Sequence, residues 1–145
     1  AGRKNKRGTV VLQTSSPEHP VIGQVLRNDY AAMYGTQCTE RLQFSYPPFF
    51  RLIEITLRHR DSSTLNHAAE DLAITMRKVF GSRVLGPNIP AVSRIQNWYI
   101  KQILLKIETT ASAGKAKQIL SEITTGLLAK SAYKSTRISI DVDPM

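Results

Sequence analysis

The feature that most restricts the fold is an alternation of apolar and polar side chains that follows Pro47-Pro48. Over residues 50–58 this pattern places Ile53, Ile55 and Leu57 on one face of an expected β-strand. A strand with one apolar face needs neighbouring strands for its backbone and a covering layer for that face. The alternation therefore predicts a layered domain that is built around a sheet.

Three further segments of the chain read as strands. They are residues 83–85, which Gly86-Pro87 would stop and residues 91–96 would resume after a kink, residues 98–107, and residues 136–142. The last two alternate as clearly as the first strand does. Their inward apolar positions are Ile103, Leu105 and Ile107, and then Ile138, Ile140 and Val142.

Two amphipathic helices are expected between these strands. One would be capped by Ser62 or Ser63 and end at Gly81, and the other would begin at Ser112 or Gly114 and run to Leu128. The resulting order is β-α-β-β-α-β, the split βαβ arrangement of ferredoxin-like α+β folds. Both helices would cover one face of a four-stranded antiparallel sheet. The other face would be open and would carry polar and basic side chains that include Arg58, Lys106 and Arg137.

The chain before this domain has a different pattern. Residues 9–14 are apolar and β-branched and predict a short strand, and residues 18–45 predict two helices, the second capped by Asn28 or Asp29. We therefore expect three parts: a lead-in over residues 1–17, a helical connector over residues 18–49, and a C-terminal domain over residues 50–145.

Positive charge is concentrated in two blocks of the sequence. The 145 residues include 20 Lys and Arg against 11 Asp and Glu, for a formal net charge of +9. Residues 1–10 contain four basic residues and no acid, and residues 77–106 contain six and no acid. Such blocks attract phosphates, and nucleic acid is the most common large polyanion in cytoplasm. A basic face that only contacts solvent is the alternative.

Several kinds of chemistry are absent from the sequence. There is no phosphate-binding G-x-x-x-x-G-K-[ST] loop and no H-E-x-x-H metal motif, and no histidine has metal-ligand spacing with another ligand. The pair Asp141 and Asp143 could bind Mg²⁺, but such a pair more often ends a strand and meets a nearby base, and we favour that role. A single cysteine, Cys38, indicates a reducing, cytoplasmic setting, and no apolar run is long enough for a membrane span. We therefore expect no metal site, no cofactor and no independent enzyme activity in this stretch.

The stretch from Arg94 to Gln102 is the strongest local signal for a binding site. Trp98 and Tyr99 could stack on bases while Arg94 and Lys101 contact phosphates. The same residues could instead form a peptide pocket whose cations receive an acidic C-terminus. They could also be a simple hairpin in which Trp98 fills the core.

A set of motifs in fixed order resembles the C-terminal end of the PriA proteins, the bacterial primosomal replication-restart helicases. The motifs cover essentially the whole chain. They are Ala1-Gly2-Arg3, residues 8–14, Pro17 to Pro20, Asp29-Tyr30, Tyr34, Glu40-Arg41, Tyr46 to Phe49, Val84 to Pro87, Tyr99, Gln102 to Lys106, and Ile140 to Pro144. This resemblance, together with the missing initiator Met, leads us to expect a C-terminal fragment whose residues 1–17 end the second helicase lobe.

The resemblance implies a function for the parent chain. It implies a 3′ to 5′ DNA helicase that couples ATP hydrolysis to unwinding at stalled forks and loads the primosome, with ATP, Mg²⁺ and Zn²⁺ bound outside this stretch. It also implies a domain similar to a small-subunit ribosomal protein, and it implies DNA forks, single-stranded DNA-binding protein and other primosome proteins as partners. Arg3 matches the last Arg of a helicase motif that reaches the ATP γ-phosphate in the intact motor.

The resemblance and the charge pattern together select the candidate binding residues. For DNA or partner binding these are Arg94, Trp98, Tyr99, Lys101, Lys106, Lys115, Lys117 and Gln118. Three functions remain open for the stretch. It could hold fork DNA, it could dock the acidic tail of single-stranded DNA-binding protein with little DNA binding of its own, or it could brace the helicase lobes.

Overall fold

A computed structural model of the chain describes residues 8–144. The chain divides into two compact units, Ala1–Glu40 and Arg41–Met145. The division falls inside a helix, α2 (Tyr30–Gln43), and not at the double proline. The assignment of residues 1–17 to a helicase lobe and of residues 18–49 to a connector stays a prediction.

The first unit contains α1 (Pro20–Leu26) and most of α2, as the apolar spacing predicts. His19 caps α1 by accepting a hydrogen bond from Val21 N, and Asp29 Oδ1 accepts from Ala32 N at 3.0 Å at the start of α2. Gln24 Nε2 donates to Thr36 Oγ1 at 3.2 Å and so joins the two helices. No residue of α2 is fully buried within the described part of the chain.

The short strand predicted over residues 9–14 is wrong. Residues 8–14 form no strand, and the side chains of Val10 and Val11 are exposed. A β-branched apolar run becomes a strand only when another strand accepts its backbone hydrogen bonds, and no strand in the described residues pairs with this one.

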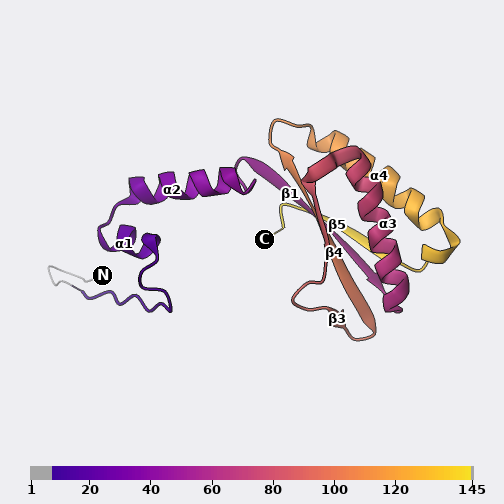
Figure 1. Cartoon of the computed structure of the whole chain (residues 1–145), viewed down its shortest axis with the longest axis horizontal. Coiled ribbons are helices and arrows are strands. Elements are labelled where there is room, and N and C mark those ends of the chain that lie inside the picture. Colours follow the sequence, from indigo (N-terminus) through magenta and orange to yellow (C-terminus); the bar gives the residue numbers. More distant parts are fainter. Residues whose placement is uncertain (1–7, 145) are drawn as a thin grey trace. The chain divides into compact units, whose positions relative to one another are not determined.

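The second unit has the predicted order of elements (Figure 1). Its strands are β1 (Phe50–His59), β2 (Val84–Asn88), β3 (Arg94–Ile95), β4 (Trp98–Glu108) and β5 (Arg137–Val142). Its helices are α3 (Ser62–Phe80) and α4 (Ala113–Ala129), each followed by a short 3₁₀ turn, η1 (Gly81–Arg83) and η2 (Ser131–Tyr133). The split β-α-β-β-α-β arrangement is confirmed, with the two-residue β3 added as a hairpin arm.

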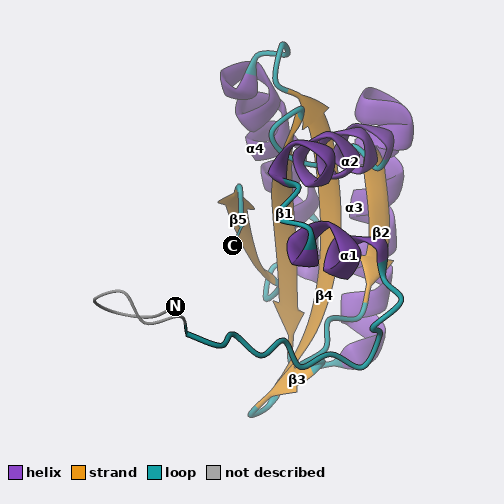
Figure 2. Cartoon of the chain, turned by 90° about the vertical axis from the view of Figure 1, so that its left-hand side faces the viewer, coloured by secondary structure: helices purple, strands orange, loops and turns teal. Residues whose placement is uncertain are grey.

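The sheet is antiparallel and its strand order is β2-β4-β1-β5, which can be followed from right to left in Figure 2. This order follows from the connections, because each helix carries the chain across the sheet past one strand before the next strand pairs. β3 pairs only with β4, through Arg94 opposite Tyr99 and Ile95 opposite Trp98. The α+β fold class predicted from the sequence is confirmed.

The core lies between the sheet and the helices α3 and α4. The alternating residues of β1 and β4 supply its sheet side, and the small and apolar stripe of α3 supplies much of the rest. Ile53, Ile55 and Leu57 face Ile103 and Leu105 across the β1–β4 register, and all five are fully buried. α4 adds Ala116, Leu120 and Leu127. The helices therefore occupy one face and leave the even-numbered residues of β4 on the other.

Two local predictions need correction. The N-cap of α3 is Asp61, whose carboxylate accepts from Thr64 N at 2.7 Å, and not Ser62 or Ser63. β2 does not stop at Gly86-Pro87 but continues to Asn88 with an irregular register. β2 is an edge strand, and Pro87 lies in its irregular part, outside the paired positions, so its missing N–H does not interrupt the ladder.

Candidate nucleic-acid interface

The β3–β4 hairpin divides the predicted aromatic stretch between the two faces of the sheet. Tyr99 packs against the core cluster on the helix side, and the period of two puts Lys101 on that same side. Trp98 lies on the opposite face. The structure therefore does not arrange Trp98 and Tyr99 as one continuous stacking platform.

Each aromatic ring of the hairpin is covered by arginine. The guanidinium carbon of Arg94 lies 5.0 Å from the centroid of Tyr99, directly across the β3–β4 pair. Trp98 has two such neighbours, Arg137 at 4.4 Å and Arg60 at 5.3 Å. Arg60 follows β1 and Arg137 begins β5, so three strand ends meet at this corner of the sheet. Contacts of this kind hold a guanidinium plane in place through cation–π attraction.

The cations at this corner lack acidic partners. Arg58, Arg60, Arg94, Lys134 and Arg137 are exposed, and within residues 8–144 none of them is within 4.0 Å of a carboxylate oxygen in an ion pair. Unpaired, exposed cations next to aromatic rings are typical of surfaces that bind a polyanion.

A groove lies beside Trp98 on this corner, and we call it the Trp98 groove. It is lined by His59, Arg60, Trp98 and residues 134–137, and its volume is about 490 Å³. His59 is buried at its base, with Nε2 2.8 Å from Ser135 Oγ and Nδ1 accepting from Asp61 N at 2.9 Å. Thr136 is only 4% exposed.

The turn before this groove is anchored to α3. Asp71 of α3 accepts hydrogen bonds from Lys130 Nζ at 2.9 Å and from the Tyr133 hydroxyl at 3.0 Å. Both hydrogen bonds lower the pKa of the Asp71 carboxyl, and the one from Lys130 has the larger effect. The anchored η2 turn leads directly into residues 134–136, so the groove wall has a fixed position relative to the sheet.

Sequence reasoning found only part of this corner. Arg58 and Arg137 were expected on the open face of the sheet, and Arg94 and Trp98 in the hairpin. Arg60, Lys134, Thr136 and the buried His59 were missed. They come from loops that flank strands, where no periodic pattern exists, and only the β1–β4 and β1–β5 registers bring them together.

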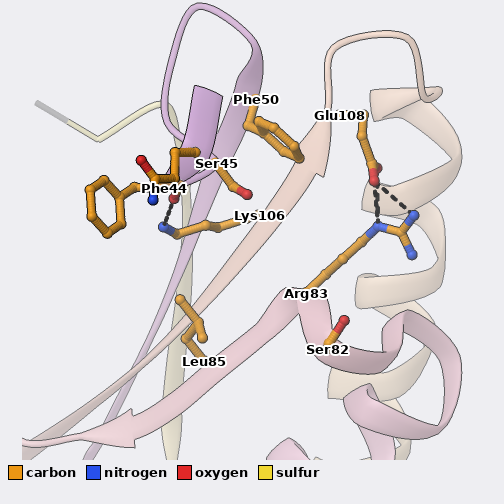
Figure 3. Close-up of a pocket in the computed structure, with 9 residues that line it drawn as sticks. Phe44, Ser45, Phe50, Ser82, Arg83, Leu85, Lys106 and Glu108 are labelled. Atoms are coloured by element: carbon orange, nitrogen blue, oxygen red, sulfur yellow. Dashed lines mark hydrogen bonds and ion pairs between the residues drawn. The ribbon is translucent and has the colours of Figure 1, made fainter. Parts of the chain in front are cut away.

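Lys106 lies far from this corner, at the other end of β4. Eight residues of strand separate it from Trp98, roughly 26 Å. Its Nζ donates to Phe44 O at 2.7 Å and lies 3.9 Å from the centroid of Tyr46. Figure 3 shows it in a second hollow of about 490 Å³, where Arg83 donates to both carboxylate oxygens of Glu108. These hydrogen bonds lower the pKa of Glu108, so both cations of this pocket already have partners.

Lys115 lines a third and smaller hollow at the start of α4, which we call the α4 pocket. Its volume is about 190 Å³, and its apolar walls are Phe80, Ile107, Ala116 and Ile119. Lys117 and Gln118 are exposed on α4, and Gln118 Nε2 donates to Glu122 at 3.2 Å. Neither Lys117 nor Gln118 lines the pocket. The structure thus separates the predicted binding residues into the Trp98 corner, the Lys106 pocket and the start of α4.

The remaining expectations concern Arg3, a metal site, the Asp141–Asp143 pair and a membrane span. Arg3 lies outside residues 8–144. Across those residues, no three or more His, Cys, Asp or Glu side chains are grouped so that they could hold a metal ion. Asp143 ends β5 by accepting from Leu52 N at 3.3 Å, which is the strand-ending role favoured for it from the sequence. No helix in the described range is long and apolar enough to cross a bilayer.

Comparison with known proteins identifies the family of this chain. The family model described as the primosomal protein N C-terminal domain matches residues 42–145. The chain is 31% identical over 148 residues to the replication restart protein PriA of Bacillus subtilis, which covers 99% of the chain and 18% of that relative. It is 33% identical to PriA of Treponema pallidum over 73% of the chain and 16% of that relative, and 32% identical to PriA of Haemophilus influenzae over 99% and 19%.

These matches confirm the resemblance seen in the ordered motifs. The chain spans less than a fifth of the length of each of these three relatives. The domain match begins at residue 42, one residue after the start of the second compact unit. The chain therefore belongs to the family of primosomal protein N C-terminal domains.

Proposed function

We propose that this chain is a DNA- and partner-binding domain of a cytoplasmic replication restart helicase, and that it holds fork DNA through phosphate contacts. One observation carries the proposal: exposed arginines at the Trp98 corner have aromatic neighbours but no carboxylate neighbours in the described part of the chain. Cations that are free of acids can neutralise phosphates and release the counterions condensed on DNA. The names of the relatives, replication restart proteins, agree with a DNA substrate.

In this proposal the domain contributes binding and not catalysis. The ATP, Mg²⁺ and Zn²⁺ of the motor would be held by other parts of a longer chain. The intact motor would use Arg3 at its nucleotide site. Other primosome proteins would meet the complex at the fork.

Titration of labelled fork DNA at two salt concentrations tests the proposal. Between roughly 50 and 200 mM salt, a surface that contacts several phosphates loses orders of magnitude in affinity. The variant Arg60→Glu, at the Trp98 corner, should weaken binding strongly. Lys78→Glu makes the same charge change near the end of α3, at the opposite end of the sheet, and should have a small effect. Absence of binding by the unaltered chain at low salt would refute the proposal.

The α4 pocket favours a second function for the same domain. An acidic peptide that ends in an aromatic residue, as in the tail of single-stranded DNA-binding protein, would place its ring against Phe80, Ile107 and Ile119. Its carboxylates would meet Lys115 at the rim of the pocket. This arrangement needs no DNA and uses residues away from Trp98.

Fluorescence polarisation with a labelled tail peptide tests this second function. Removal of the terminal Phe should weaken binding by at least tenfold, the order expected for one buried aromatic anchor. Lys115→Glu should weaken binding more than Lys117→Glu, because only Lys115 lines the pocket. Equal binding of the intact and shortened peptides would exclude the pocket model.

A further inference from the structure

We infer that the Trp98 groove is a phosphate subsite, in which the hydroxyl of Thr136 and the guanidinium of Arg137 bind one phosphate of a DNA strand. In this assignment Trp98 positions arginines and is not a surface for base stacking. The inference rests on the proposed function and adds to it the location and chemistry of one contact.

The two guanidinium groups on Trp98 keep their hydrogen-bond donors available. The guanidinium carbons of Arg60 and Arg137 lie 5.3 and 4.4 Å from the centroid of the indole ring, and neither side chain donates a hydrogen bond to a described residue. An arginine has five N–H donors in a planar fork that matches a phosphate. Cation–π contact fixes the plane of the guanidinium while its N–H edge stays open to a ligand.

The cross-strand register adds an electrostatic reason for an anion at this place. Arg58 of β1 is directly opposite Arg137 of β5. Like charges in directly opposed positions repel one another and destabilise the pair. Neither residue forms an ion pair with a carboxylate in the range 8–144, so a bound phosphate would supply the missing negative charge.

The hydroxyl of Thr136 is the second component of the subsite. Thr136 lines the groove, is 4% exposed, and its Oγ1 has no hydrogen-bond partner among the described residues. A buried hydroxyl without a partner is costly, because its hydrogen bonds to water are lost and not replaced. Because this oxygen is itself buried, a phosphate oxygen can accept from the hydroxyl once the Thr136 side chain turns toward the groove.

Two neighbouring contacts hold the groove wall in place. His59 Nε2 lies 2.8 Å from Ser135 Oγ, and Thr136 N donates to Tyr133 O at 2.9 Å. Tyr133 is in turn bound to Asp71 of α3. The backbone of Thr136 is therefore held by a turn that is fixed at both ends, which lowers the entropy lost on binding.

The pocket in Figure 3 is an internal comparison for this argument. It has the same volume of about 490 Å³ and also contains two cations. There, the arginine is paired with a carboxylate, Arg83 with Glu108, and Lys106 donates one hydrogen bond to Phe44 O. Pairing of the cations distinguishes the two hollows, and only the Trp98 groove combines unpaired arginines with an unpartnered hydroxyl.

Trp98 is the only tryptophan of the chain, so its fluorescence reports directly on the groove. Titration of the full chain with inorganic phosphate, at constant ionic strength in chloride, should give a saturable change. Thr136→Val keeps the shape of the side chain and removes the donor, and should weaken phosphate binding about tenfold. Thr125→Val, on the exposed side of α4, is the matched control and should leave it unchanged. A change in fluorescence that is linear in phosphate concentration, and equal in the Thr136→Val and Thr125→Val variants, would overturn the inference.

A second experiment, with DNA, distinguishes failure of this inference from failure of the proposed function. Arg137→Gln should weaken binding of a labelled duplex about tenfold and lower the salt slope by roughly 0.9, the loss of one phosphate contact. If the chain binds DNA with a steep salt slope that Arg137→Gln and Thr136→Val leave unchanged, the subsite is wrong and the proposed function stands. If phosphate saturates the groove but no DNA binds, the proposed function fails. Competition by an acidic peptide and not by DNA would assign the groove to a protein partner and overturn the inference.

Discussion

Gly86 is the residue whose backbone most clearly needs a glycine. Its φ is +95°, and a β-carbon built on it would lie 2.9 Å from Gln102 O and 3.0 Å from Asn88 N. Both atoms belong to the backbone of paired strands, so neither can move without disturbing the β2–β4 ladder. The carbonyl of Gly86 also accepts a hydrogen bond from Arg77 of α3, which ties this bend to the helix layer.

Gly86→Ala is therefore expected to destabilise the domain by about 1–3 kcal/mol, through the positive φ and the close backbone contact. Chemical denaturation monitored by circular dichroism measures the change. Gly126→Ala is the matched control, because Gly126 lies in the last turn of α4 with nothing within 4 Å of the added carbon. That control should be neutral or stabilising by up to about 1 kcal/mol. Equal destabilisation by both changes would contradict the assignment.

At the scale of elements, β1 separates a buried strand from an edge strand. Ile55 of β1 has Ile103 of β4 on one side and Ile140 of β5 on the other. Ile103 is fully buried, whereas Ile140 is 39% exposed. The periodic pattern treats the two residues alike, and the difference arises because β5 is the outer strand, beyond most of the covering helices.

Substitution of these two isoleucines should give unequal losses. Ile103→Ala should lower the free energy of unfolding by about 2–5 kcal/mol, since it leaves a cavity in the centre of the core. Ile140→Ala should cost about 1 kcal/mol or less, because its side chain already contacts solvent. Urea denaturation of both variants checks the ratio. Similar losses of unfolding free energy in the two variants would show that Ile140 on β5 is as well buried as Ile103.

At the scale of the whole molecule, hydrogen bonds to three carboxylates make the stability of the domain depend on pH. Thr64 N lowers the pKa of Asp61, Lys130 and Tyr133 lower that of Asp71, and Arg83 lowers that of Glu108. A carboxyl whose pKa is depressed on folding contributes stability above its unfolded pKa, about 4, and loses it as the pH falls through the folded value. Acid also raises a net charge that is already +9.

The domain is therefore expected to be less stable at pH 3 than at pH 7. Denaturant midpoints at the two pH values measure the difference. Asp71→Asn should reduce the pH dependence modestly, by at most about 1 kcal/mol, because the Asp71–Lys130 pair is exposed and screened by solvent. The same midpoint at both pH values would show that these bonds contribute nothing to folding.

Strong periodicity made most of the fold predictable. The alternation in β1, β4 and β5 and the stripe of α3 were read correctly, because burial on one face imposes a period that local sequence displays. The errors fall where a partner decides the outcome. Residues 9–14 have strand-like side chains and no strand to pair with, and β2 passes through Pro87 because it lies at an edge.

The candidate site was less predictable than the fold. Arg94, Trp98 and Tyr99 were selected as one aromatic and basic cluster, but neighbouring residues of a strand point to opposite faces. Tyr99 therefore joins the core side while Trp98 meets Arg60 and Arg137. The net charge indicated a polyanion partner without indicating which cations are free. That depends on carboxylates distant in sequence, such as Glu108 beside Arg83 and Asp71 beside Lys130.

The sequence alone determined the order of strands and helices, the core residues of the central strands and the basic character of the chain, because these depend on spacing within one element. Only the tertiary structure decided that Arg60 and Arg137 gather around Trp98, beside Thr136 and with Arg58 opposite Arg137. These residues come from both ends of the domain. They meet because β1 lies between β4 and β5, and pairing between distant strands leaves no periodic signal in the sequence.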